Sequence, residues 1–182
     1  MMKEVAVPLS PRELRTAFGS FATGVTVVTA VRPDGEPVGI TANSFTSVSL
    51  DPPMLLWCLN SASESLPAFE TGASFAVHVL DHRQRDLAIH FARRQKDKFE
   101  VSSEWRTART PPVLADVLCR FDCRVHAAHP CGDHVVIIGA ITGVAQQPGR
   151  SLAFHEGRFG SVKPDPTSLH LDPWMSGDDH WY

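Results

Sequence analysis

The polar segment at residues 41–49 contains the side chains whose types and spacing best suit ligand chemistry. Six of its nine side chains can form hydrogen bonds, none is charged, and apolar segments lie on both sides of it. Hydroxyls, an amide and backbone N–H groups along a groove suit a ligand with an anionic phosphate and a flat heteroaromatic ring. An exposed edge strand or a surface loop rich in Ser and Thr has the same composition. Composition alone therefore leaves both interpretations open.

A second group of chemically capable residues lies between positions 126 and 134. His126, His129, Cys131 and His134 are all residue types that zinc accepts as ligands. We expect strand and turn geometry to scatter them, and the sequence has no second clustered half-site. We therefore expect no metal site, and we interpret His126 and His129 as surface or turn residues.

Several familiar catalytic and cofactor-binding motifs are absent. The sequence has no GxGxxG after a strand-like segment, no phosphate loop ending in Gly-Lys-Ser/Thr, no GxSxG and no HExxH. If a dinucleotide binds to this protein, it does so without a Rossmann motif.

Charge and composition argue against several classes of partner. The net charge is -3, and Lys and Arg are scattered, apart from Arg93-Arg94 followed by Lys96 and Lys98. We therefore expect no nucleic-acid partner. No uncharged stretch reaches the roughly 20 apolar residues of a membrane span, and the first residues do not resemble a secretion signal. The four cysteines form no CxxC pair, so we expect reduced, buried thiols in a cytoplasmic protein.

A helix is the first element that the sequence predicts. Ser10 precedes Pro11, and Glu13 follows three residues after Ser10, which is the pattern of a capping box. The apolar face of this helix consists of Leu14, Ala17, Phe18 and Phe21. We expect the helix to end at Gly24.

Strands dominate the remaining pattern. Strand-like segments lie at 25–31, 38–45, 54–59, 74–80, 117–127 and 135–145, with a short piece at 152–154. Two further helices are expected, at 63–71 and from a capping Asp81 to about Arg94. About seven strands without regular βαβ alternation favour a mainly β protein, an antiparallel barrel with peripheral α-helices. We expect an N-terminal extension at 1–10, one domain at 11–163 with a loop at 95–110, and an extended C-terminal tail at 164–182.

The chain resembles the flavin reductase-like domain family in segments that occur in order over residues 14–160. These segments are FATGVTVVT at 21–29, GITANSFTSVSLDPP at 39–53, FAVHVL at 75–80, DKF at 97–99, PVLA at 112–115, GDH at 132–134 and FHEGRFG at 154–160. The family serves as the short-chain reductase component of two-component flavin-dependent monooxygenases. The resemblance implies a split antiparallel β-barrel of the flavin reductase type.

The resemblance also implies roles for individual residues. It implies that the flavin contacts Thr41, Ala42, Asn43, Ser44, Ser47, Val48 and Ser49, with Asn60 and Ser63 on the phosphate side. The segment that closes over the flavin matches Phe91, Ala92, Lys98 and Phe99, and Lys98 can also offset phosphate charge. His134 matches the position associated with the nicotinamide and is the candidate catalytic residue. The late segment that flanks the ring and the pyridine nucleotide matches His155, Arg158 and Phe159.

The implied activity is reduction of FMN or FAD by NADH or NADPH, by direct hydride transfer in a homodimer that supplies reduced flavin to a partner monooxygenase. Such a transfer needs ring stacking and hydrogen bonds rather than a nucleophile or a strong acid. Two alternatives stay open: an enzyme that keeps its flavin and reduces another acceptor, and a non-catalytic flavin- or ligand-binding barrel.

Overall fold

The computed structural model describes residues 9–94, 98–99, 105–106 and 111–163. Its helices are α1 (Pro11–Gly19), the short 3-10 helix η1 (Leu66–Phe69) and α2 (Arg85–Ala92). Its strands are β1 (Thr23–Gly24), β2 (Thr26–Val31), β3 (Pro37–Ala42), β4 (Thr46–Leu50), β5 (Pro53–Asn60), β6 (Ser74–Val79), β7 (Trp105–Arg106), β8 (Val113–Leu114), β9 (Cys119–Cys131), β10 (His134–Gln146), β11 (Leu152–His155) and β12 (Arg158–Ser161). The expected tail at 164–182, most of the extension at 1–10 and most of the loop at 95–110 lie outside the described residues.

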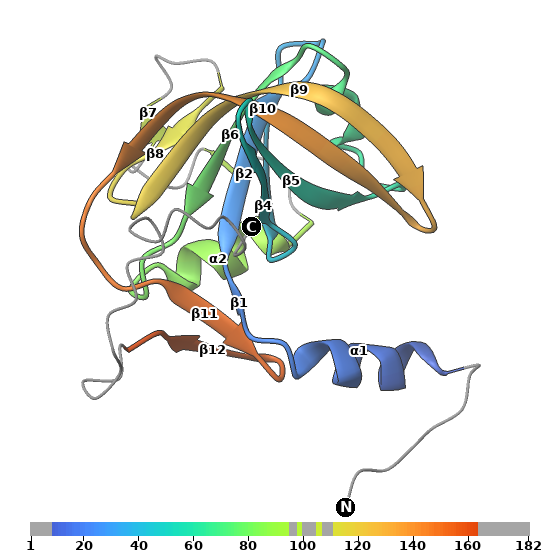
Figure 1. The fold of residues 1–182 in the computed structure, drawn as a ribbon, viewed down its shortest axis with the longest axis vertical. Coiled ribbons are helices and arrows are strands. Elements are labelled where there is room, and N and C mark those ends of the chain that lie inside the picture. Colours follow the sequence, from blue (N-terminus) through green and yellow to red (C-terminus); the bar gives the residue numbers. More distant parts are fainter. Residues whose placement is uncertain (1–8, 95–97, 100–104, 107–110, 164–182) are drawn as a thin grey trace, which may run out of the picture.

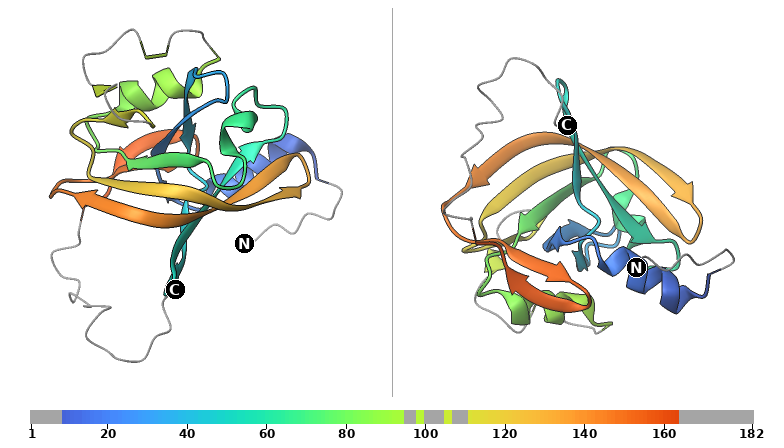
Figure 2. Two further views of the ribbon diagram at one scale, coloured as in Figure 1. Left: turned by 90° about the horizontal axis from the view of Figure 1, so that it is seen from above. Right: turned by 60° about the horizontal axis from the view of Figure 1, so that its bottom comes forward.

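The central sheet confirms the prediction of a mainly β, antiparallel fold. Seven antiparallel strands pair in the order β3-β2-β6-β9-β10-β5-β4. The long β9–β10 ribbon curves over the molecule and carries the sheet around (Figures 1 and 2). The two edge strands are β3 and β4, and residues 43–45 connect them directly. The sheet therefore curls into a barrel that is split between β3 and β5, with α2 on one side and the β11–β12 hairpin beside it.

Two apolar clusters hold this arrangement together. The first fills the inside of the curled sheet around Trp57, whose ring meets Phe69 edge-on at a centroid separation of 4.9 Å. Phe75 completes this group, and its ring passes so close to Gly139 that a Cβ there would lie 2.4 Å from it. The second cluster packs Phe91 of α2 between β2, β11 and β8. Phe91 thereby links the outer helix to the sheet.

Three helix predictions need correction. The capping box at Ser10 is confirmed, but α1 ends at Gly19 rather than Gly24. Segment 63–71 forms only the 3-10 turn η1. Asp81 does not cap α2: its carboxylate accepts the Arg83 N–H in a preceding turn, and the helix begins one turn later, after Gln84.

The strand predictions agree with the structure in most places. The strand expected at 38–45 is β3, which ends at Ala42, and the sequence analysis missed the strands β4 and β12. No helix in the described part of the chain is both long and apolar enough to span a membrane.

Candidate functional site

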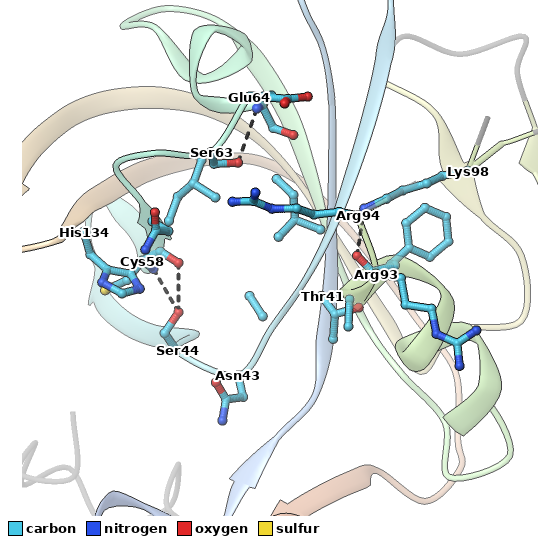
Figure 3. Close-up of a pocket in the computed structure, with 17 residues that line it drawn as sticks. Thr41, Asn43, Ser44, Cys58, Ser63, Glu64, Arg93, Arg94, Lys98 and His134 are labelled. Atoms are coloured by element: carbon cyan, nitrogen blue, oxygen red, sulfur yellow. Dashed lines mark hydrogen bonds between the residues drawn. The ribbon is translucent and has the colours of Figure 1, made fainter. Parts of the chain in front are cut away.

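A cavity of about 690 Å³ lies at the split of the barrel. Its walls come from β3 and the link that follows it, from β5, from the turn before η1, from the end of α2 and from the start of β10 (Figure 3). This volume is typical of small-molecule sites. The wall combines apolar side chains such as Ile40 and Leu59 with polar ones, so it suits a ligand that has both a flat apolar face and polar ends.

The structure brings many of the expected site residues to this cavity. Those that line it are Thr41, Ala42, Asn43, Ser44, Asn60, Ser63, Phe91, Ala92, Lys98 and His134. The sequence analysis missed a further set of lining residues, which are Ile40, Cys58, Leu59, Glu64, Ser65, Arg93 and Arg94. The adjacent Arg93 and Arg94 were the visible signal, because they interrupt an otherwise scattered distribution of positive charge.

Other expected residues lie away from the cavity wall. Ser47, Val48 and Ser49 are on the edge strand β4, beyond the bend at residues 43–45. His155, Arg158 and Phe159 are on the β11–β12 hairpin, where Phe159 packs on the second apolar cluster. Phe99 also packs on that cluster, with its ring centroid 5.6 Å from that of Phe91. In this chain alone, these residues do not share one cavity with His134.

Two of the hydroxyls in the wall hold the cavity together. The Thr41 hydroxyl donates to the Ala88 carbonyl at 2.6 Å and ties β3 to α2. The Ser44 hydroxyl accepts from the Cys58 N–H at 2.9 Å. It also donates to the Cys58 carbonyl, at 3.4 Å. Ser44 therefore bridges the split at a place where no backbone hydrogen bonds join β3 to β5. These bonds fix the width of the cavity.

The turn after β5 presents polar groups to the opposite wall. The Asn60 side-chain oxygen accepts from the Ala62 N–H at 2.9 Å, and the Ser63 hydroxyl oxygen accepts from the Ser65 N–H at 3.3 Å. These bonds use acceptors only. The Asn60 amide N–H groups and the Ser63 O–H therefore remain able to donate to a ligand.

Lys98 is tied to the backbone beside the cavity. Its Nζ donates to the carbonyls of Gly39 and Phe91, both at 2.9 Å, and lies 5.8 Å from the centre of the Phe91 ring. Burial lowers the pKa of this ammonium. Two of its three N–H donors are thus committed to the protein, and Lys98 acts first as a brace between β3 and α2.

His134 lies at the start of β10, directly opposite Asn60 on β5. Its Nδ1 lies 2.7 Å from the Asp133 carboxylate, and 44% of its side chain is exposed. The hydrogen bond from His134 lowers the pKa of Asp133. Because a carboxylate accepts, Nδ1 carries a proton, and Nε2 is the ring nitrogen left for a ligand.

The described residues contain no group of three or more His, Cys, Asp or Glu side chains that could hold a metal ion. All four cysteines are unpaired, but the prediction that they are buried is correct only for Cys123, because Cys131 is exposed in the β9–β10 turn and Cys58 and Cys119 are half-buried. Cys58 alone among them lines the cavity.

Comparison with known proteins identifies the relatives of this chain. An FMN reductase (NADH), SmoA, from Agrobacterium fabrum is 44% identical over 149 residues, which cover 82% of this chain and 84% of the relative. HsaB, the reductase subunit of a flavin-dependent monooxygenase from Mycobacterium tuberculosis, is 34% identical over 168 residues, which cover 90% of this chain and 89% of the relative. Two relatives from Rhizobium meliloti are longer, and the chain spans only 48% and 65% of their lengths.

A solved structure agrees with these relatives. The NADH:FAD oxidoreductase SgcE6 of Streptomyces globisporus, in complex with NAD and FAD fragments, has a TM-score of 0.81 and 36% identity, covering 90% of this chain and 99% of the other. The sequence pattern of the flavin reductase like domain matches residues 18–163. With the split barrel and its cavity, this match establishes that the chain belongs to the flavin reductase like domain family.

Proposed function

We propose that this chain is a flavin reductase, which uses NADH or NADPH to reduce FMN or FAD and supplies the reduced flavin to a partner monooxygenase. The observation that carries the proposal is the cavity at the split of the barrel, in a chain of this family. Relatives named as an FMN reductase (NADH), an NADH:FAD oxidoreductase and a monooxygenase reductase subunit support it.

The lining residues suit a flavin. Ile40, Ala42 and Leu59 offer apolar surface to a flat ring. The side-chain amide of Asn43 has no hydrogen-bond partner among the described residues and can bond a ring edge. Ser63 and Asn60 supply donors on the opposite wall. The cavity wall therefore combines apolar surface with polar groups, as the isoalloxazine ring and the ribityl phosphate of a flavin require.

The chemistry itself is a direct hydride transfer from the nicotinamide ring to the flavin ring. The protein contributes binding and orientation. His134 borders the cavity with Nε2 available, and Asp133 holds its ring through Nδ1. We assign His134 to positioning the nicotinamide beside the flavin. Ser44 and Thr41 keep the walls at a fixed separation, so that the two rings can stack.

A flavin that leaves after reduction must be held by moderate contacts. Two hydroxyls of the wall and most of the Lys98 donors are already bonded to the protein. This arrangement favours exchange of the flavin over permanent retention. The same contacts are fewer than we expect for the alternative, an enzyme that keeps a tightly bound flavin and reduces another acceptor.

We further propose that the chain functions as a homodimer. Helix α1 buries no residue, and its apolar face leaves Leu14, Phe18 and, just beyond the helix, Phe21 exposed by 37%, 72% and 77%. Figure 1 shows α1 extending sideways from the body of the protein, beside the β11–β12 hairpin. Exposed apolar patches of this kind mark interaction sites. A second copy of the chain would cover this face.

A cytoplasmic location completes the proposal. The four unpaired cysteines support it, because disulfides are rare in reducing compartments.

The proposal is tested by mixing the purified protein with NADH or NADPH and FMN, FAD or no flavin, and following loss of the reduced nicotinamide absorbance. Oxidation that depends on added flavin and saturates with it is the expected result. Protein that purifies yellow and ignores added flavin would instead support the bound-flavin enzyme. Flavin binding without turnover with either nucleotide would indicate a binding barrel.

A further inference from the structure

A second cavity, of about 520 Å³, lies apart from the one at the split of the barrel. It is formed by the turn before α2, the link between β8 and β9 and the residues after β10, and its lining residues are Arg83, Gln84, Asp116, Leu118, Gln147 and Pro148. None of them lines the first cavity. Gln84 directly precedes α2, whereas Phe91 and Ala92 at the other end of this helix line the first cavity. The second cavity is therefore a separate candidate site.

Arg83 supplies a guanidinium that is held in place. Its Nε donates at 2.7 Å to the carboxylate of Asp81, which is buried and also accepts the Arg83 backbone N–H at 3.0 Å. The two Nη groups have no hydrogen-bond partner among the described residues, and 74% of the side chain is exposed. Parallel N–H donors on a fixed guanidinium suit a carboxylate.

Asp116 supplies the opposite charge in the same wall. It is exposed, and its carboxylate forms no ion pair with any residue that the structure describes, Arg83 included. The two charges still act on one another, because the pKa of Arg83 is raised mainly by its hydrogen bond to Asp81 and also by the charge of Asp116. Opposite charges that line one cavity without meeting leave room between them for a ligand that carries both.

Gln147 adds a second acceptor to the wall. Its Nε2 donates to the Val117 carbonyl at 2.9 Å, and its backbone N–H donates to the Leu118 carbonyl at 2.9 Å. These bonds fix the residue and leave the side-chain oxygen able to accept from a ligand. Gln147 and Asp116 lie close together, because they also share the wall of a smaller adjoining cavity. Their oxygens together suit an ammonium group.

We propose that this second cavity binds a small zwitterion, an α-amino acid with an apolar side chain. Its carboxylate lies on Arg83, and its ammonium lies between Asp116 and Gln147. A simple anion would leave Asp116 unpaired, and a simple cation would leave the Nη groups of Arg83 unused. The side chain of the amino acid then lies on Leu118 and Pro148, the apolar residues of the wall. The site does not depend on the proposed function, because none of its residues borders the first cavity.

The test is isothermal titration calorimetry of the full chain with L-leucine and with two derivatives that each lack one charge. N-acetyl-L-leucine has no ammonium, and L-leucinamide has no carboxylate. We expect saturable binding of L-leucine with a Kd of about 0.1–1 mM. For each derivative we expect a Kd about 10- to 100-fold higher, as for loss of a charged hydrogen bond.

Asp116→Asn removes one charge at a position where Asn fits the backbone. Asp116 has a φ of +55°, and Asn adopts this left-handed region more readily than most residues. The variant should raise the Kd for L-leucine about 10-fold or more and should not weaken binding of N-acetyl-L-leucine, which has no ammonium. Asp86→Asn is the matched control, because it removes the same charge from an exposed residue of α2 outside the cavity. It should change the Kd for L-leucine by less than about twofold.

Arg83→Lys tests the other end of the ligand. Lys keeps the positive charge beside Asp81 but lacks the fork, so binding of L-leucine should weaken while binding of L-leucinamide stays unchanged. Thermal unfolding of each variant shows whether the fold is intact.

Three outcomes would overturn the proposal. These are no saturable heat with L-leucine, equal affinity for L-leucine and both derivatives, and equal losses in Asp116→Asn and Asp86→Asn. Flavin-dependent oxidation of NADH should be unchanged in Asp116→Asn. Failure of the amino-acid site and failure of the proposed function are therefore read from different assays.

Discussion

Buried His78 makes the stability of the fold depend on pH in a way that can be calculated. Its side chain is fully buried on β6, where Nδ1 lies 3.0 Å from the Val27 carbonyl and Nε2 accepts the Leu114 N–H at 3.2 Å. The imidazole is therefore neutral, with its proton on Nδ1. A second proton would have to enter at Nε2, opposite an N–H donor. Burial is the main cause that lowers the pKa of His78, from 6.5 to about 4, and the positive charge of Arg120 adds to it.

The sign and size of the effect follow from proton linkage. Between pH 6.5 and about pH 4 the unfolded chain binds a proton at His78 that the folded chain does not bind. The contribution of neutral His78 to the free energy of unfolding is therefore fully present above pH 6.5 and is lost as the pH drops toward 4. The shift corresponds to about 3 kcal/mol in full, most of which is lost between about pH 7.5 and about pH 4.5.

The assay is urea unfolding of the wild type and of His78→Gln at a series of pH values and one protein concentration. Gln keeps a donor and an acceptor but does not titrate. The other eight histidines and all carboxylates are common to both proteins, so their contributions cancel in the difference. The wild type should lose about 2–3 kcal/mol more than His78→Gln on acidification, with an unchanged m-value. Parallel pH profiles would refute the reasoning and show that His78 binds its proton as readily in the folded protein as in the unfolded chain.

Three further predictions concern packing, assembly and the nucleotide. Gly39→Ala would place a Cβ 2.5 Å from the Phe91 ring, so it should cost about 1–3 kcal/mol in urea unfolding and weaken FMN binding, whereas Gly160→Ala, with open space around it, should do neither. Equal losses of stability in Gly39→Ala and Gly160→Ala would show that the clash with the Phe91 ring does not cause the loss. Phe18→Glu combined with Phe21→Glu should convert the dimer to a monomer in size-exclusion chromatography with light scattering, and an unchanged mass would remove α1 from the interface. His134→Ala should raise the KM for NADH far more than that for flavin in steady-state assays, and a change in flavin affinity alone would contradict its assignment.

Local patterns in the sequence predicted the elements that depend on local interactions. The Ser10 capping box and the β-branched strand now called β2 are both present, because a cap and a period of two need only neighbouring residues. The errors occur where contacts between residues far apart in the sequence determine the bounds of an element. The chain leaves α1 before Gly24 because Thr23 pairs with Phe154 on β11. No periodicity in residues 10–24 can reveal that partner.

The candidate site was predictable in the same uneven way. Motif resemblance brought attention to residues 41–44, and the structure puts them in the cavity wall. It could not show that the chain bends at residues 43–45 and carries Ser47 and Ser49 onto an edge strand. Cys58 and Arg94 reach the wall only because the sheet curls until β5 and the end of α2 face one another. Such proximity is a property of the closed fold rather than of any segment.

The pairing of β1 with β11 also has a consequence for how the protein is made. Thr23 lies opposite Phe154, and the Val25 N–H donates to the Leu152 carbonyl, so β1 pairs with β11, about 130 residues further along the chain. A ribosome synthesises the chain from its N-terminus, and contacts between distant residues form slowly. Strand β1 must therefore wait, with Val25 lacking its bond to Leu152, until residues 152–155 have emerged. Nascent chains stalled before β11 should for this reason be the ones that chaperones hold.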